Sequence, residues 1–97
     1  MNVKKHPKYD EFLSGIKDLV AKAKVIIRTE NLAAGNPGKV RHVGSGVWEM
    51  KINYGPGWRV YYVRVGDEIV MLLTGGTKNG QQDDIDAAKK LAEDLTE

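Results

Sequence analysis

Apolar residues in the first third of the chain recur at intervals of three and four, the period of a helix that buries one face. Pro7 suits the first turn of a helix that runs to about Ile16, because a first-turn residue needs no backbone N–H. Gly15 and Asp18 would form the break and the N-cap before a second helix, so the pair predicts a helical hairpin. The second helix must stop near the turn formers of residues 35–38. Its predicted buried face consists of Ile16, Leu19, Val20, Ala23, Ile26 and Ile27.

After this turn the apolar positions follow a period of two, which is typical of strands. Residues 47–54 alternate, and residues 58–65 are rich in β-branched and aromatic side chains. Residues 69–74 are nearly all apolar, as expected of a central strand that is buried on both faces. The sequences GPG at 55–57 and GD at 66–67 would form the connections. Three consecutive strands with short turns predict an antiparallel β-meander.

The last segment returns to the helical period. Three carboxylates in its first turns suit the positive end of a helix dipole, and residues 2–5 are a further candidate for a short strand. These elements predict one α+β domain over residues 1–97, with an N-terminal helical hairpin and a C-terminal helix packed on a twisted antiparallel meander. The apolar positions of the last helix are Ile85, Ala88, Leu91, Ala92 and Leu95, and its first-turn carboxylates are Asp83, Asp84 and Asp86.

The composition excludes several kinds of chemistry. The chain has no cysteine, which removes disulfides, thiolate nucleophiles and cysteine-ligated metals. With only His6 and His42 besides, we expect no metal site and no cofactor. No apolar run reaches the roughly 18 residues that span a bilayer, and no signal peptide is recognisable at the N-terminus. The sequence therefore predicts a cytoplasmic protein that does not contact a membrane.

The net charge of +2 conceals an uneven distribution. Residues 1–64 contain 12 Lys and Arg against 5 Asp and Glu, whereas residues 65–97 contain 3 against 8. A basic body with an acidic end predicts positive potential over part of the surface. A solvated charged surface explains the same asymmetry equally well.

Candidate chemistry lies on the meander. The period of two places Glu49 and Lys51 on one face of the first meander strand, and Arg59 and Tyr61 on one face of the second. Adjacent strands can bring these faces together, and Lys78 follows the third strand closely. Such a cluster fits a phosphodiester, because Arg grips phosphate oxygens in pairs and Lys adds a point charge. On spacing alone, an ordinary solvated face with cross-strand ion pairs is the more frequent explanation.

Three stretches resemble one family. Residues 44–62, GSGVWEMKINYGPGWRVYY, are similar to a conserved block of the RelE/ParE toxin superfamily and most similar to its HigB-like "addiction module killer" branch. Residues 72–88, LLTGGTKNGQQDDIDAA, resemble the ending of that group, and residues 35–38 resemble its GNxG turn. The resemblance covers residues 16–95. Two positions depart from it, since many relatives have Arg in place of Lys51 and Asp in place of Thr77.

The resemblance implies the toxin of a type II toxin–antitoxin module. It implies a RelE-like fold and a cognate antitoxin, expected to be of the helix-turn-helix type, that covers and blocks the toxin. Most relatives of this kind cleave messenger RNA, usually on the ribosome, and so inhibit translation. ParE-like relatives instead inhibit DNA gyrase without cleaving anything, and a third alternative is an inactive domain that serves only for interaction. Fold alone does not choose among the three.

A ribonuclease of this kind needs no metal, because the 2′-hydroxyl of the RNA attacks the adjacent phosphate. Arg59 would stabilise the added phosphate charge, supported by Lys51 and Lys78. Glu49 or an uncharged Lys51 would take the proton. Tyr61 would orient the nucleophile or stack on a base. Further RNA contacts are expected from Arg41, His42 and Arg64.

Overall fold

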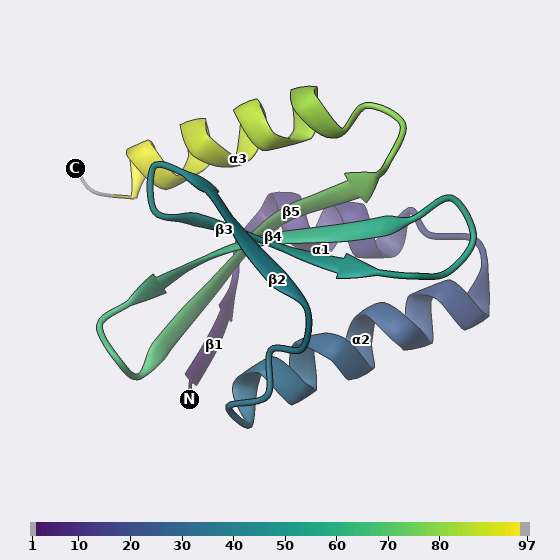
Figure 1. Cartoon of the computed structure of the whole chain (residues 1–97), viewed down its shortest axis with the longest axis horizontal. Coiled ribbons are helices and arrows are strands. Elements are labelled where there is room, and N and C mark those ends of the chain that lie inside the picture. Colours follow the sequence, from purple (N-terminus) through teal and green to yellow (C-terminus); the bar gives the residue numbers. More distant parts are fainter. Residues whose placement is uncertain (1, 96–97) are drawn as a thin grey trace.

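The computed structural model describes residues 2–95, which form a five-stranded sheet with helices on both faces (Figure 1). The sheet order is β1-β5-β4-β3-β2. Helices α1 and α2 cover one face and α3 covers the other. No helix among residues 2–95 is long and apolar enough to cross a membrane. The strands are β1 (Asn2–Lys5), β2 (Val40–Gly44), β3 (Val47–Ile52), β4 (Trp58–Val65) and β5 (Ile69–Thr77), and the helices are α1 (Pro7–Ser14), α2 (Leu19–Ala33) and α3 (Gln81–Asp94).

The sheet is mixed, whereas an antiparallel sheet was expected. Strands β3, β4 and β5 do form the predicted antiparallel meander. The candidate strand at residues 2–5 is present, but it pairs with β5 in parallel. Strand β2, which was not predicted, pairs with β3 at the opposite edge. An edge strand has a neighbour on one side only, so its sequence need not show the continuous apolar pattern of a central strand.

The helical hairpin is confirmed in outline. Pro7 opens α1, which ends at Ser14 rather than near Ile16. The carboxylate of Asp18 caps α2 by accepting hydrogen bonds from the backbone N–H groups of Val20 and Ala21, at 2.9 and 3.2 Å. A side-chain acceptor at this position stabilises a helix by about 1 kcal/mol.

The predicted buried face of α2 is wrong apart from Ile16, which precedes the helix and is buried. Leu19 is 78 % exposed and Ile27 is 54 % exposed. The helix carries two apolar stripes on opposite sides, and both have helical spacing. The prediction chose the stripe with the larger side chains, which is the exposed one. Arg28 fixes the observed rotation, because its guanidinium donates to the carbonyl oxygens of Lys51 and Pro37 at 2.8 and 3.2 Å. The stripe that packs on the sheet consists of Ala21, Val25, Thr29 and Leu32.

One apolar cluster lies on each face of the sheet. Side chains of β4 alternate between the two clusters. Val60 and Tyr62 pack under α1 and α2, whereas Tyr61 and Val63 face α3. Strands β3, β4 and β5 are therefore buried on both faces over much of their length. This explains why β5 is nearly all apolar in sequence.

The glycine pair at the end of β5 lets both helical layers approach one strand. Gly75 lies against the ring of Phe12 in α1, and Gly76 lies against the carboxylate of Asp84 in α3. A methyl group on Gly75 would overlap the Phe12 ring and the carbonyl oxygen of Arg59, and one on Gly76 would overlap the Asp84 carboxylate. Close approach, rather than a turn, accounts for both glycines.

We expect Gly75→Ala to lower the free energy of unfolding by about 2 kcal/mol, as insertion of a methyl group into a packed interior typically does. The Arg59 carbonyl belongs to the neighbouring strand and cannot move without disturbing the sheet. Urea denaturation followed by circular dichroism measures the change. Gly46→Ala is a suitable control, because no atom lies within 4 Å of the added methyl group there, and the positive φ of Gly46 gives only a backbone cost. A Gly75→Ala variant as stable as the wild type would contradict the close packing.

Candidate functional site

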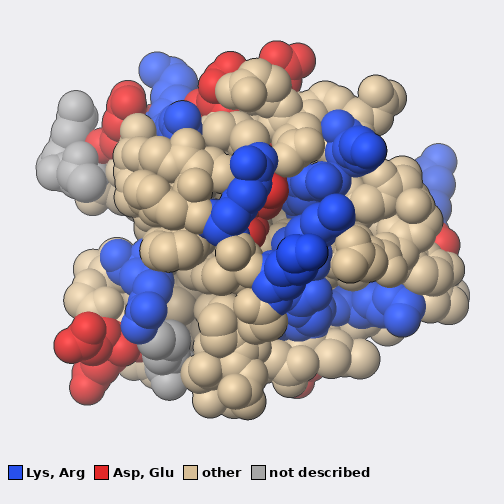
Figure 2. Space-filling model, viewed as in Figure 1, with Lys and Arg blue, Asp and Glu red and all other residues tan. Residues whose placement is uncertain are grey.

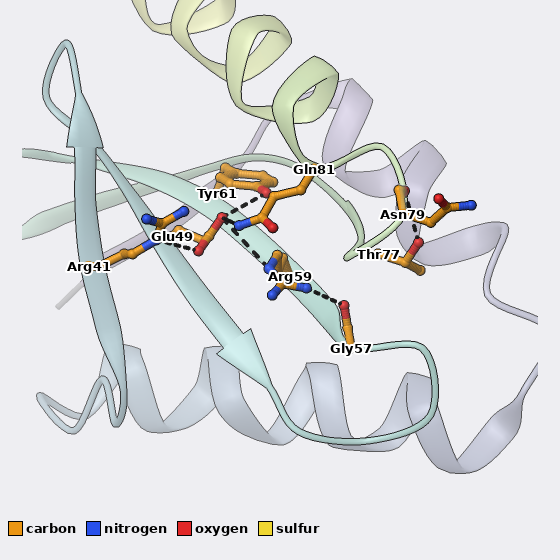
Figure 3. Close-up of polar contacts among 8 residues, drawn as sticks. All are labelled: Arg41, Glu49, Gly57, Arg59, Tyr61, Thr77, Asn79 and Gln81. Atoms are coloured by element: carbon orange, nitrogen blue, oxygen red, sulfur yellow. Dashed lines mark hydrogen bonds and ion pairs between the residues drawn. The ribbon is translucent and has the colours of Figure 1, made fainter.

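Strand register brings the predicted cluster together. Glu49 pairs with Tyr61 and Lys51 pairs with Arg59 across β3 and β4. Arg41 of β2 lies opposite Glu49 on the other side. Apart from Lys51, which alternation along β3 places on the same face as Glu49, these side chains are drawn in Figure 3 and lie on the face of the sheet that α3 covers in part. The expectation that the two meander strands place their polar faces side by side is confirmed.

Glu49 is the centre of the cluster and is only 3 % exposed. Its Oε1 accepts a hydrogen bond from Arg41 Nε at 2.8 Å. Its Oε2 accepts hydrogen bonds from the Tyr61 hydroxyl at 3.0 Å and from Gln81 Nε2 at 2.9 Å (Figure 3). Arg59 Nε lies 3.8 Å from the same oxygen. Each carboxylate oxygen is therefore occupied by a donor.

These contacts keep Glu49 ionised. Burial by itself raises the pKa of the Glu49 carboxyl, but the hydrogen bonds from Arg41, Gln81 and Tyr61 and the charge of Arg41 outweigh burial and hold that pKa below its usual range. A carboxylate with a low pKa and fully engaged oxygens is a weak proton acceptor. The arrangement suits Glu49 to holding its neighbours in position.

Tyr61 is fully buried beneath α3. Burial is the main cause that raises the pKa of its phenol, and the charge of Glu49 and the hydrogen bond donated to it add to the effect. The hydroxyl therefore stays protonated and donates to Glu49. A ring enclosed in this way has no surface on which a nucleic-acid base could stack.

Arg59 is a buried cation with spare hydrogen-bond donors. The side chain is held by one hydrogen bond, from Nη1 to the Gly57 carbonyl oxygen at 2.8 Å, and the residue is only 5 % exposed. Its buried Nε has no hydrogen-bond partner. An unbonded polar group in such a place costs roughly 1–3 kcal/mol, and more for a charged one. An anion bound beside the guanidinium would offset its buried charge.

Two hollows in the surface meet at Arg59 and Lys51, which line both. The first has a volume of about 250 Å³ and reaches β2 through Lys39, Val40 and Arg41. The second has a volume of about 350 Å³ and extends along the 53–57 turn to Lys78. Lys and Arg side chains gather on this side of the molecule (Figure 2). Converging cations around a buried guanidinium have the charge and the donor groups that suit a phosphate or another anion. The first hollow is lined by Lys39, Val40, Arg41, Glu49, Lys51, Arg59 and Gln81.

Not every predicted residue reaches this site. Lys78 does, since its backbone N–H donates to the Gly57 carbonyl oxygen at 2.9 Å and the residue lines the second hollow. His42, predicted in a loop, lies in β2, and its ring stacks edge-on against Trp48 on the opposite face of the sheet. Arg64 also alternates onto that opposite face, five residues along β4 from Arg59. The structure thus separates His42 and Arg64 from the cluster.

Gln81 was missed as a site residue. It begins α3, and its amide reaches Glu49 across the sheet. The only signal in the sequence was its position within the stretch that resembles a family ending. Local spacing cannot reveal a contact between residues 32 positions apart.

The described residues 2–95 contain no group of three or more His, Asp or Glu side chains that could hold a metal ion. The cluster itself presents one buried guanidinium, three lysines that line the two hollows and one engaged carboxylate.

Comparison with known proteins gives two matches. A family model described as "Phage derived protein Gp49-like (DUF891)" matches residues 9–96. An uncharacterized protein of Haemophilus influenzae is 42 % identical over 87 residues, which cover 90 % of this chain and 88 % of that protein. The region of similarity includes every residue of the cluster.

Proposed function

Because the chain belongs to the Gp49-like family, which has the RelE/ParE-like toxin fold, we propose that it is the toxin of a type II toxin–antitoxin module and cleaves messenger RNA. Cleavage would require no metal and would inhibit translation, on the ribosome or off it. A cognate antitoxin, encoded beside it and expected to be of the helix-turn-helix type, would neutralise the activity. The block at residues 44–62 supports a place in the HigB-like branch.

The observation that carries this proposal is the buried Arg59 between two basic hollows. A protein that only binds gyrase needs no buried cation with unbonded donors, because a binding surface can use exposed side chains. A phosphodiester, by contrast, matches the guanidinium in charge and geometry. This favours the ribonuclease over a gyrase inhibitor or an inactive interaction module.

In the proposed reaction, the RNA 2′-hydroxyl attacks the adjacent phosphorus and the 5′-oxygen of the next nucleotide leaves. The 2′-hydroxyl proton goes to a base, a cyclic phosphate forms, and the leaving oxygen takes a proton. Arg59 would bind the phosphate oxygens as negative charge builds up on them. Lys78 would add positive potential from the second hollow.

The network of Glu49 determines how roles are divided. Its oxygens already accept three hydrogen bonds and its pKa is low, so it would position Arg41 and Arg59 rather than take the proton. Of the two bases expected from the sequence, this leaves Lys51, which lines both hollows. Tyr61 would act through Glu49, to which it donates a hydrogen bond.

We expect the purified protein, either alone or once ribosomes are added, to cut a short messenger RNA and leave 2′,3′-cyclic phosphate ends. A substrate with a single 2′-deoxynucleotide before the mapped cleavage site should resist cutting at that position, because it lacks the nucleophile. Mass spectrometry of the fragments identifies the ends. Supercoiling by DNA gyrase is assayed in parallel. Intact RNA together with blocked supercoiling would replace the proposal with gyrase inhibition, and the absence of both effects would point to an inactive interaction module.

A further inference from the structure

Helix α2 exposes an apolar stripe on the side that faces away from the sheet. Six large hydrophobic residues are exposed among residues 2–95, and four of them lie on this stripe. Leu19 is the most exposed, and the small residue Ala23 sits between it and Ile27. Contiguous apolar surface of this kind marks an interaction site in a soluble protein, whereas scattered single residues do not. The four residues are Leu19, Val20, Ile26 and Ile27.

The stripe is a ridge with a hollow on each side. Beside Ile27, a hollow of about 300 Å³ is lined by Lys24, Arg28, Ile52 and Asn53 as well. Beside Ile26, a hollow of about 340 Å³ reaches towards β1 and α1. A ridge with flanking hollows matches the grooves and ridges of a second helix. Side chains three or four residues apart on that helix could fill the hollows.

The charged residues around the ridge indicate which kind of partner helix would fit it. Lys22 and Lys24 stand on opposite sides of Ala23, and Lys17 lies just before the helix. Lys24 Nζ lies 5.3 Å above the ring of Tyr54, which fixes it beside the first hollow. Glu30, near the other end of α2, is the one acidic residue along the ridge between Leu19 and Ala33. The flanks are therefore basic over most of the ridge.

We infer that the outward face of α2 binds an amphipathic helix of a partner protein, with acidic residues flanking its apolar stripe. The partner's aliphatic side chains would cover the ridge and enter the two hollows, and its carboxylates would meet Lys22 and Lys24. Burial of four aliphatic side chains supplies affinity, while charge sets the choice of partner. The inference does not depend on ribonuclease activity, because this face lies on the opposite side of the sheet from α3.

A second copy of the chain fits the face less well. Antiparallel pairing of two α2 helices about Ala23 would bring Lys22 of one copy near Lys22 of the other, and Lys24 near Lys24, and like charges placed together across an interface are destabilising. A membrane surface is also a poorer match. The ridge has no aromatic side chain, and Glu30 would face anionic headgroups.

The test uses two synthetic peptides of about 20 residues, long enough to form a helix. Both carry leucines at helical spacing, flanked by glutamates in one peptide and by lysines in the other. In isothermal titration calorimetry with the full chain, the glutamate peptide should bind at least tenfold more tightly than the lysine peptide. Its binding should weaken as the salt concentration is raised. The double substitution Lys22→Glu with Lys24→Glu should reverse the preference.

Apolar contacts are tested with Ile27→Ser, for which Val65→Ser is the matched control because both residues are 54 % exposed. Ile27→Ser should weaken the binding of the glutamate peptide about tenfold, and Val65→Ser should leave its binding unchanged. Circular dichroism checks that both variants fold. Equal binding of the two peptides, or equal loss in both variants, would overturn the inference. Dimers that are seen in sedimentation and that Ile27→Ser disperses would also overturn the inference. The same holds if neither peptide binds and the protein instead binds phosphatidylserine vesicles in a way that Ile27→Ser removes.

Discussion

Arg59→Ala is expected to abolish growth inhibition on induction and to reduce RNA cleavage at least 10²–10³-fold, the usual cost of removing one group that stabilises transition-state charge. Among residues 2–95, Arg59 alone has a guanidinium that lines both hollows. The fold should survive, because Glu49 keeps its hydrogen bonds from Arg41, Tyr61 and Gln81. Cleavage rates on a defined RNA and a thermal melt of the variant measure the two effects.

Two further variants sharpen this test. Arg64→Ala makes the same change in the same strand, but on the opposite face, so cleavage should remain at the wild-type level. Arg59→Lys keeps the charge and loses the paired donors, and we expect activity between that of wild type and Arg59→Ala. A folded Arg59→Ala protein with undiminished cleavage would remove Arg59 from the mechanism.

Glu49→Gln is expected to lower the free energy of unfolding by about 3 kcal/mol at neutral pH, because removal of one partner leaves a buried charge uncompensated. That charge is Arg59, whose Nε lies 3.8 Å from Glu49 Oε2. Glu11→Gln is the matched control. Glu11 forms an exposed ion pair with Lys8 at 3.5 Å, and such pairs contribute at most about 1 kcal/mol.

The effect of Glu49→Gln should depend on pH in a defined direction. The pKa of Glu49 is lower in the folded protein than its usual value of 4.5, so ionised Glu49 stabilises the fold fully above pH 4.5. This contribution is lost as the pH falls below 4.5 and through the folded pKa. Urea titrations at a series of pH values should therefore show the stability gap closing in acid. A gap that is constant down to the acid limit, or absent at neutral pH, would count against Glu49 as the charge partner.

The fold was predictable where burial follows local periodicity. The meander, the Asp18 cap and the final helix are properties of short segments, and the structure contains all three. The orientation of α2 was not predictable, because the helix has two apolar stripes and only tertiary contacts choose between them. Arg28 makes those contacts with residues 9 and 23 positions away. The parallel pairing of β1 with β5 likewise joins residues more than 60 positions apart.

The candidate site, like the fold, was predictable only where local sequence pattern decides the structure. Alternation placed Glu49 with Lys51 and Arg59 with Tyr61, and strand pairing brought the two pairs together. Burial of Glu49 was not visible in the sequence, since charged residues are almost never fully buried unless they are paired. Gln81 could not be assigned a partner, because it reaches Glu49 only once α3 has packed on the sheet.

The hydrogen bonds of Glu49 also have a consequence for synthesis. They connect residues from Arg41 to Gln81, and β5 lies between the first strand of the chain and β4. A growing polypeptide emerges N-terminus first, so the segment of the helical hairpin emerges before the strands that complete the sheet. The Glu49 cluster is therefore incomplete until translation has passed Gln81. A nascent chain from which Gln81 has not yet emerged therefore lacks the assembled cluster.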